Sequence, residues 1–413
     1  MRVSPYSLVS VEDALNIILQ SVAPLPAQSM PLAQALGLVL AEDAHANAPQ
    51  PPFAAATVDG FAVRVVDGRS PRRLIGRQMA GSAAHLGIAA GEAVRITTGA
   101  PVPAGADAIV MVEQADEVND QIYLHDVAAL AAGMHIRSVG FDVQPGQTVL
   151  TAGAILGPAE LGVLASLGLA SVAVHRRPVV GVLSTGDELA PAGQPLQPGQ
   201  IYDSNRVALL AAVTQAGGVA LDLGMARDDP AGLVQRFEQA LPRVDVLVAS
   251  GGVSMGELDL LKPLLAQRGQ VHVGRVRMKP GKPMTFATVT HNTARVPVFA
   301  LPGNPVSALV TFTLFVRPAI RRLLGHATVS LPRLTATLGH AFTLDPERPE
   351  FHRVQLRRMD ERFVAISTGV QASSRLLSAA GANGLLLLEQ GDGVLPAGTE
   401  RPVWLFNEDW LAL

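Results

Sequence analysis

The sequence predicts a multidomain α/β plus β protein: a central doubly wound, mostly parallel α/β domain, a β-rich inserted domain, a helical linker domain and a C-terminal β domain. The α/β domain is indicated by apolar, β-branched runs that each lead into a polar, glycine-rich loop, at 178–184, 244–250, 271–277 and 296–300. Helical patterns separate several of these runs, as is typical of a parallel sheet. In such a sheet the loops after the strands gather at one edge, where ligands bind.

Composition limits the possible classes of protein. The 413 residues suggest about two to four domains, and a hydrophobic content of 48% is ample for several cores. The formal net charge of −3 gives no general attraction to nucleic acid or to an anionic membrane. Any anion must therefore be bound by a local arrangement of residues.

The absence of cysteine excludes disulfides, thiolate metal sites, iron–sulfur clusters and a cysteine nucleophile. The first residues lack the apolar core of a secretion signal. No uninterrupted apolar stretch approaches the roughly 20 residues that a membrane helix needs. We expect a soluble cytoplasmic protein that contacts no membrane and no nucleic acid.

The first 140 residues change from helical to β-type patterns. An amphipathic helix is expected over 10–20, where a serine and an aspartate have capping-box spacing, and a second, weaker helix over 32–41. Residues 48–53 are rich in proline and mark a boundary. Short strand candidates follow, of which 108–113 is the clearest.

Further helices and strands complete the domain plan. A helix near 158–167 opens with proline, which favours the first helical turn. In the α/β part, helices are expected at 205–215, 230–240, 260–267 and 305–324. The predicted domains are a linker formed by 1–49 and 141–177, a β-rich insertion at 50–140, the α/β domain at 178–326, and a C-terminal β domain at 327–413.

Two loops of the α/β domain carry the strongest signs of a binding site. Thr185, Gly186, Asp187 and Glu188 follow a buried strand and place carboxylates at the sheet edge, although a solvated polar turn explains an isolated Gly-Asp-Glu equally well. The loop 250–259 is more specific. Its residues Ser250, Gly251, Gly252 and Ser254 would let backbone N–H groups approach an anion, while Asp259 could instead cap the following helix.

Two aspartate segments allow a similar choice. Asp229 stands directly before Pro230 and is best explained as a helix N-cap, which leaves Asp228 freer to reach a site. The segment 203–205 also precedes a helix, so capping is again a strong explanation.

The remaining loops offer cations and a helix start. Lys279 and Lys282 lie in a loop stiffened by two prolines, where a lysine can neutralise an oxyanion, although most lysines are simply exposed. Asn304 begins a long apolar helix, whose N–H groups suit phosphate. A P-loop, a G-x-G-x-x-G fingerprint, an H-E-x-x-H motif and a G-x-S-x-G elbow are absent from the sequence.

Taken together, the motifs resemble the molybdopterin molybdenumtransferase family of the MoeA type, which is related to the E domain of gephyrin. The matching segments are D-G-F-A at 59–62, T-G-A-P-V-P-A-G-A-D at 98–107, G-F-D-V-Q-P-G at 140–146, S-T-G-D-E-L at 184–189, D-S-N at 203–205, S-G-G-V-S-M-G-E-L-D at 250–259, M-K-P-G-K-P at 278–283, L-P-G-N-P-V-S-A at 301–308 and A-N-G-L at 382–385. Their order and spacing cover nearly the whole chain. Val58 and Phe141 depart from the residues usual in the family.

The resemblance implies an elongated four-domain homodimer that inserts molybdate into adenylylated molybdopterin and releases AMP, with a divalent cation such as Mg²⁺. It also implies the other enzymes of molybdenum cofactor biosynthesis as possible partners. The catalytic candidates are Asp59, Thr98, Asp142, Glu188, Asp228 and Asp259, and the last three of these are the candidate metal ligands. Asp59 and Thr98 are expected to come from the other subunit. The candidate substrate-binding residues are Thr185, Gly186, Asp187, Ser250, Gly251, Gly252, Ser254, Lys279, Lys282, Pro302, Asn304 and Ser307.

Two other functions fit parts of the pattern. One is a scaffold that has kept the fold for binding molybdopterin without catalysis. The other is a generic Mg²⁺-dependent nucleotide pyrophosphatase, which would turn over simple dinucleotides without molybdate.

Overall fold

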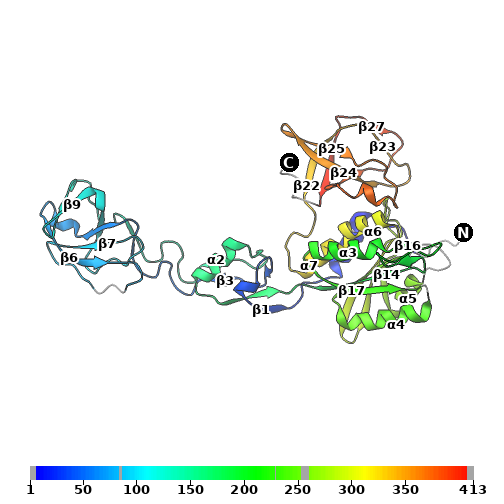
Figure 1. The fold of residues 1–413 in the computed structure, drawn as a ribbon, viewed down its shortest axis with the longest axis horizontal. Helices are drawn as coiled ribbons and strands as arrows, with labels where there is room; N and C mark the ends of the chain where they lie inside the picture. Colours follow the sequence, from blue (N-terminus) through cyan, green and yellow to red (C-terminus); the bar gives the residue numbers. More distant parts are fainter. Residues whose placement is uncertain (1–5, 83–85, 228, 253–259, 407–413) are drawn as a thin grey trace. The chain divides into compact units, whose positions relative to one another are not determined.

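The structure is a computed structural model that describes residues 6–82, 86–227, 229–252 and 260–406 (Figure 1). The chain forms two compact units. Unit 1 consists of Met1–Gln28 and Ala173–Leu413, and unit 2 is Ser29–Val172. Unit 2 is therefore an insertion in the sequence of unit 1. The finer division into four domains stays a prediction.

Unit 1 is built on a six-stranded sheet in the order β17-β14-β18-β21-β20-β19. Its strands are β14 (Val179–Thr185), β17 (Val219–Ala226), β18 (Val246–Ser250), β19 (Gly269–Val273), β20 (Thr285–His291) and β21 (Ala294–Leu301). The first four strands of the order pair in parallel, whereas β20 is antiparallel to both of its neighbours. The predicted mostly parallel sheet is confirmed, and β20 is an addition that the strand patterns did not reveal.

Helices cover both faces of this sheet. Figure 1 shows α3, α6 and α7 on one face and α4 and α5 on the other. Their bounds are α3 (Ser204–Gln215), α4 (Pro230–Ala240), α5 (Leu261–Arg268), α6 (Pro305–Thr311) and α7 (Arg317–Leu323). Side chains alternate between two cores: Val246 and Val248 pack on the side of α3, while Leu247 and Ala249 pack on the side of α4. Because both faces are buried, the strands are apolar throughout.

Local capping explains where α4 and the N-terminal helix begin. Asp229 accepts a hydrogen bond from the Gly232 N–H at 2.7 Å, and Pro230 occupies the first helical position of α4. Ser10 caps the N-terminal helix α1 (Val11–Gln20) in the same way through the Asp13 N–H. The helices predicted at 205–215, 230–240 and 260–267 are confirmed to within one residue at each end.

The helix predicted over 305–324 contains a π-helical turn. Phe312–Val316 is π-helical and lies between α6 and α7. Pro318 has no backbone N–H to donate to the preceding turn, which fits a local widening of the helix at this point.

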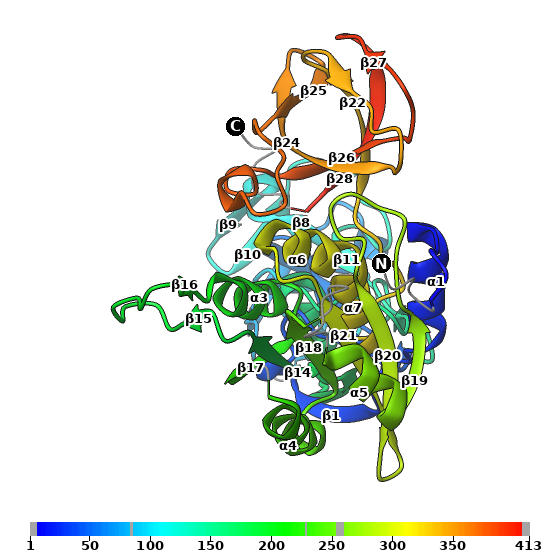
Figure 2. The ribbon, with the colours of Figure 1, turned by 90° about the vertical axis from the view of Figure 1, so that its right-hand side faces the viewer.

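The C-terminal part of unit 1 is a closed barrel in the order β22-β25-β24-β26-β28 (Figure 2). Its strands are β22 (Arg333–Leu338), β24 (Glu350–Met359), β25 (Arg362–Ser367), β26 (Gly384–Leu388) and β28 (Glu400–Leu405), with β23 (Phe342–Thr343) and β27 (Val394–Leu395) as a separate pair. Phe351 and Leu385 of the barrel share a hydrophobic core with the α/β sheet. The barrel and the α/β domain therefore pack directly together.

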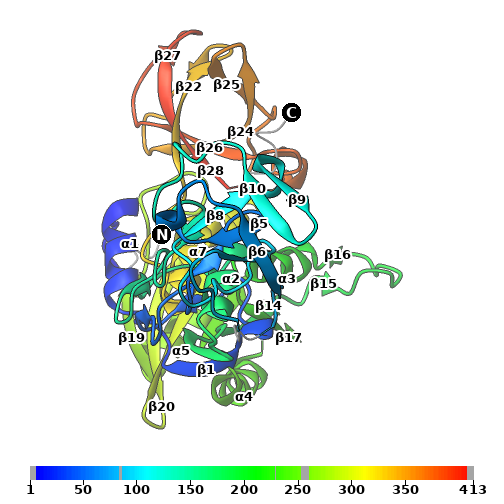
Figure 3. The same ribbon diagram turned by 90° about the vertical axis from the view of Figure 1, so that its left-hand side faces the viewer.

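Unit 2 contains a six-stranded sheet in the order β8-β5-β7-β6-β10-β9 (Figure 3). Its strands are β5 (Gly60–Val63), β6 (Arg72–Gln78), β7 (Glu92–Ile96), β8 (Ala108–Met111), β9 (Ala115–Val118) and β10 (Gln121–Leu124). The expected strand over 108–113 is present as β8. The expected helix near 158–167 is also present, as α2 (Pro158–Ser166).

The helix predicted over 32–41 is wrong. Only Leu32–Gln34 is helical, as a single 3-10 turn, and Val39–Leu40 forms the strand β2. Gly37 has φ of 74°, and its N–H donates to the Leu156 carbonyl. Pairing with a segment more than 100 residues away therefore overrides the weak helical pattern.

Membrane-spanning helices were also sought over residues 6–82, 86–227, 229–252 and 260–406. None of the helices there has the length and the apolar character needed to cross a bilayer.

Candidate active site

The loops at the carboxyl edge of the parallel strands enclose a cavity of about 660 Å³ in unit 1. It is lined by the loops after β14, β18 and β21 and by the start of α3. Among the predicted site residues, the lining includes Thr185, Gly186, Glu188, Ser250, Gly251, Gly252, Pro302 and Asn304. The structure thus brings together residues that are up to about 120 positions apart in the sequence.

The glycines after β18 are required by close backbone packing. Gly251 has φ of 98°, and a Cβ atom at this position would lie 2.4 Å from the Thr185 carbonyl oxygen. Its N–H donates to the Leu301 carbonyl at 3.1 Å. The Gly251 N–H therefore links two neighbouring strand ends, and the approach of the other backbone N–H groups of this loop to an anion stays a prediction. Ser254 and Asp259 of the same motif lie outside the described residues.

The turn after β14 separates two cavities. Glu188 lines the first cavity, and Asp187 lines a second cavity of about 790 Å³ that shares Gly186 and Leu189 with it. Glu188 is exposed, and its carboxylate folds back over Gly186, within 2.5–2.8 Å of where a Cβ would stand. A side chain at Gly186 would therefore displace the carboxylate.

The second cavity receives Asp229, together with Arg227 and Arg236. Asp229 caps α4, so its predicted structural role is confirmed. Asp228, the predicted site residue beside it, lies outside the described residues.

Asp203 is buried, and its hydrogen bonds explain its place before α3. It accepts from the Ser184 hydroxyl at 3.0 Å, from the Arg206 N–H at 3.1 Å and from Arg206 Nε at 2.9 Å. The hydrogen bond to Asp203 raises the pKa of Arg206, and the charges of Asp203 and Asp222 add to this effect. The capping interpretation of the 203–205 segment is confirmed for its first residue.

Polar residues at the start of α6 contact the C-terminal barrel. Asn304 Nδ2 donates to the Ser373 hydroxyl at 3.1 Å, and the Val306 N–H donates to the Ser373 carbonyl at 3.1 Å. One of the free N–H groups at the start of this helix therefore already has a hydrogen-bond acceptor within the protein. Ser307 is buried, and its carbonyl accepts from Thr311. It does not belong to the cavity lining.

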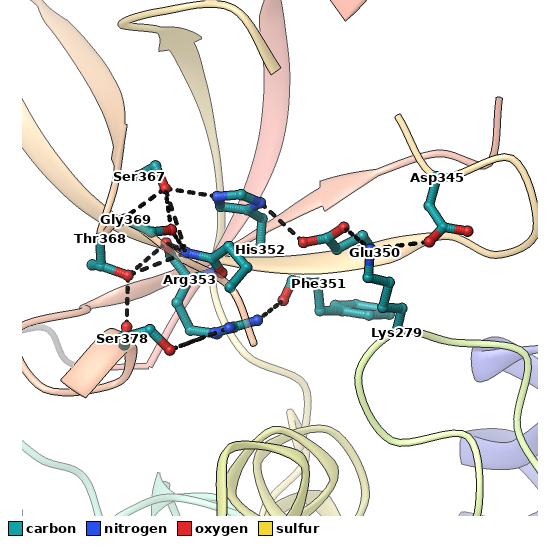
Figure 4. A network of polar contacts seen from close by, with 11 residues as sticks. Lys279, Asp345, Glu350, Phe351, His352, Arg353, Ser367, Thr368, Gly369 and Ser378 are labelled. Atoms are coloured by element: carbon teal, nitrogen blue, oxygen red, sulfur yellow. Dashed lines mark hydrogen bonds and ion pairs between the residues drawn. The ribbon is translucent and has the colours of Figure 1, made fainter. Parts of the chain in front are cut away.

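Lys279 makes two ion pairs instead of facing the cavity lining. Its ammonium lies 3.0 Å from Asp345 and 3.0 Å from Glu350, both in the C-terminal part of unit 1 (Figure 4). Burial lowers the pKa of Lys279, but the hydrogen bonds and charges of the two carboxylates outweigh it and raise the pKa above its ordinary value. Lys282 is half-buried and also lies outside the cavity lining. Its neighbour Pro283 is part of that lining.

Asp59 and Thr98, predicted as a pair, meet in unit 2. Asp59 Oδ1 accepts from the Thr98 N–H at 2.6 Å and from the Thr98 hydroxyl at 2.8 Å. The hydrogen bond from the Thr98 N–H lowers the pKa of Asp59, and the hydroxyl adds to the effect. The carboxylate is therefore ionised at neutral pH.

Asp142, the third predicted residue of unit 2, forms an ion pair with Arg137. The hydrogen bond that Arg137 donates to the Asp142 carboxylate raises the pKa of Arg137. The Arg137 guanidinium also lies 5.8 Å from the centre of the exposed Phe141 ring, an aromatic contact that the replacement noted in the sequence makes possible.

The described part of the chain offers few carboxylates that could bind a metal ion. Within it, no group of three or more histidine, aspartate or glutamate side chains is placed to hold a metal ion. Of the three predicted ligands only Glu188 is described. Its carboxylate has no hydrogen-bonding partner among the described residues, which leaves its oxygens available to a hard cation.

Several residues of the lining are absent from the predicted site, and they include three polar residues that face the cavity from separate segments or ends of segments. Tyr202, Asn205 and Ser374 line the cavity, and Ser374 comes from the C-terminal part of unit 1. Asn205 belongs to a segment that precedes a helix and matches the family motif D-S-N, but no role was predicted for this residue itself. Ser374 has no local signal, because only the packing of the barrel brings it to the sheet edge.

Comparison with known families accounts for nearly the whole chain. Residues 9–168 match the profile of the MoeA N-terminal region (domain I and II). Residues 181–322 match that of the probable molybdopterin binding domain, and residues 335–406 match that of the MoeA C-terminal region (domain IV).

Curated relatives and solved structures extend this similarity. A molybdopterin molybdenumtransferase 2 of Mycobacterium tuberculosis is 38% identical over 96% of this chain and 99% of its own length. A molybdopterin molybdenumtransferase of Nostoc is 34% identical over 96% of this chain and 94% of its own length. Gephyrin of Dictyostelium discoideum is 36% identical over 96% of this chain, which spans only 62% of that protein.

The crystal structure of the molybdopterin biosynthesis MoeA protein of Pyrococcus horikoshii also resembles this chain. It superposes with a TM-score of 0.83 at 33% identity and covers 97% of this chain and 100% of its own. The chain therefore belongs to the MoeA family of molybdopterin molybdenumtransferases.

Proposed function

We propose that this protein is a molybdopterin molybdenumtransferase that inserts molybdate into adenylylated molybdopterin and releases AMP in molybdenum cofactor biosynthesis. The observation that carries the proposal is the cavity built from the loops at 184–189, 250–252 and 302–305. These loops lie in the segment that matches the molybdopterin binding domain. The near full-length relatives named as molybdopterin molybdenumtransferases support the reaction.

The cavity has the polar groups that a phosphorylated substrate needs. Hydroxyls and amides of Thr185, Ser250 and Asn304 line it, and its glycines allow close approach of the ligand to the backbone. Release of AMP requires water to attack a phosphorus atom of the phosphoanhydride. The bond from that phosphorus to the bridging oxygen breaks, its electron pair stays on the bridging oxygen of the departing phosphate, and the water gives up its proton to solvent.

Mg²⁺ is part of the proposal. The Glu188 carboxylate is exposed at the cavity and has no hydrogen-bonding partner among the described residues, and it is the type of oxygen ligand that Mg²⁺ prefers; Asp228 and Asp259 would complete the set. The bound ion would neutralise phosphate charge. Thr185, Ser250 and Asn304 would meanwhile hold the phosphate groups of the substrate next to the glycine loop at 250–252.

A homodimer is the second part of the proposal. Asp59, Thr98 and Asp142 lie in unit 2, and we assign them to the site of a second copy of the chain. The Asp59 carboxylate is exposed and is fixed by two hydrogen bonds, so it can meet a ligand without rearranging. Light scattering at micromolar concentration tests this assignment, and a monomer would contradict it.

The decisive experiment measures AMP release from adenylylated molybdopterin with Mg²⁺, with and without molybdate. We expect release that depends on molybdate. Glu188→Gln should lower the rate at least about tenfold, because an uncharged amide is a poorer ligand for the cation. Glu361→Gln, an exposed glutamate of the barrel, is the matched control. Binding of the substrate without AMP release would contradict the proposal, and release without molybdate would favour a pyrophosphatase.

A further inference from the structure

Asn205 links two of the loops that form the cavity. It is the second residue of α3 and is half-buried in the cavity lining. Its Nδ2 donates to the Ser250 hydroxyl at 2.7 Å and to the Gly303 carbonyl at 2.8 Å. Ser250 is the last residue of β18 and Gly303 follows β21, and these two strands are adjacent and parallel. One carboxamide therefore spans the two strand ends.

The chemistry of the partners fixes which way the amide points. A carbonyl oxygen such as that of Gly303 only accepts hydrogen bonds, so the nitrogen of Asn205 and not its oxygen must face it. Both hydrogens on that nitrogen are then used. The Oδ1 oxygen has no hydrogen-bonding partner among the described residues, so it remains as an acceptor at the cavity.

The first turn of α3, which carries Asn205, is itself held in place by hydrogen bonds. Asp203, two residues earlier, accepts from the Ser184 hydroxyl and from Arg206, so the first turn of α3 is fixed to the end of β14. Ser250 is connected in the same way, because its carbonyl accepts from the Thr185 hydroxyl at 3.4 Å. Asn205 therefore extends from a fixed point to the ends of the next two strands.

We infer that Asn205 is a positioning residue, which sets the spacing between the glycine loop at 250–252 and the loop at 302–305 around the phosphate groups of the substrate. The inference rests on the proposed function of the cavity. Alanine cannot bridge the loops. Aspartate has the same shape, but its carboxylate would oppose the Gly303 carbonyl and add a negative charge where an anion binds.

The test combines product binding with turnover. Asn205→Ala and Asn205→Asp should each weaken AMP binding, measured by calorimetry, about tenfold or more, because two hydrogen bonds that hold the site are lost. The KM for adenylylated molybdopterin should rise by a similar factor, with a smaller fall in kcat. Gln215→Ala, an exposed amide at the far end of α3, should leave both constants unchanged.

A double-mutant cycle separates positioning from general destabilisation. If Asn205 acts through Ser250, the double variant Asn205→Ala/Ser250→Ala should lose clearly less AMP affinity than the sum of the losses in the two single variants. Thermal unfolding identifies any variant that has lost its fold, and Asn205→Ser then replaces it.

Two outcomes would overturn the inference: AMP affinity equal to that of Gln215→Ala, or fully additive losses in the double variant. These outcomes are distinct from failure of the proposed function. Failure of that function would appear as wild-type protein that binds AMP but releases none from the substrate.

Discussion

Lys279 and Glu350 are joined twice. Their backbones form a parallel bridge, in which the Phe351 N–H donates to the Lys279 carbonyl at 2.7 Å, and their side chains form an ion pair at 3.0 Å (Figure 4). One residue belongs to a loop of the α/β domain and the other to the barrel. A lysine expected to meet the substrate therefore fastens the barrel to the domain that carries the cavity.

Lys279→Met is expected to destabilise unit 1. The substitution leaves the buried Glu350 and its neighbour Asp345 without their cation, which should cost about 1–3 kcal/mol of unfolding free energy. Urea denaturation at pH 7 measures the loss. Lys282→Met, in the same loop, is the control, and an equal loss in both variants would contradict a specific ion-pair contribution.

The buried His326 should make stability fall in mild acid. Burial, together with the charges of Arg321 and Arg317, lowers the pKa of His326 from 6.5 to about 4. Between pH 6.5 and pH 4, His326 is therefore protonated in the unfolded chain but neutral in the folded chain. The stabilisation is complete above pH 6.5 and is lost as the pH falls toward 4, by up to about 3 kcal/mol.

Denaturation curves from pH 7 to pH 4 test this dependence on His326. His326→Gln should flatten the decline in stability, whereas His125→Gln, which replaces a half-exposed ring, should not. A wild-type curve parallel to that of His326→Gln would show that His326 does not carry the effect.

Gly251→Ala should disrupt the cavity through sterics. The new Cβ would meet the Thr185 carbonyl oxygen at 2.4 Å, in a backbone conformation that alanine rarely adopts. We expect a loss of about 1–3 kcal/mol in stability and a large loss of AMP binding. Gly193→Ala has a similar φ of 87° with no atom within 4 Å, so it isolates the cost of the backbone conformation alone. Equal effects of the two substitutions would rule out the steric explanation.

Thr98→Val should raise the pKa of Asp59. The substitution removes the hydroxyl that donates to the carboxylate but keeps the backbone N–H, so the shift should be partial. Carboxyl NMR titration measures it. Thr98→Ser keeps the hydroxyl and should leave the titration of Asp59 unchanged, and an unshifted Asp59 in the valine variant would contradict the assignment.

The sequence alone predicted those parts of the fold that depend on residues close together in the chain. Asp229 and Pro230 define the start of α4 within two residues, and the prediction matched its observed bounds. The grouping of loops at one sheet edge followed from strand direction alone. The residues at 32–41 misled the prediction because their conformation depends on pairing with residues near 155.

Packing between residues far apart in the chain also determines the roles of Lys279 and Asn205, which the sequence did not predict. No pattern near Lys279 indicates that its partners lie at Asp345 and Glu350. In the same way, the capping pattern of 203–205 explains Asp203 but not Asn205, whose partners lie about 45 and 98 residues further along the chain. Such contacts depend on tertiary structure and leave no trace in local spacing.

The placement of unit 2 within the sequence of unit 1 affects the order in which the protein can fold during synthesis. All residues of unit 2 have been made once the ribosome passes Val172. Helix α1, in contrast, packs against α7, whose residues emerge about 300 positions after it. The apolar face of α1 therefore lacks this partner for most of translation, and the nascent chain must keep that face from aggregating until α7 has been made.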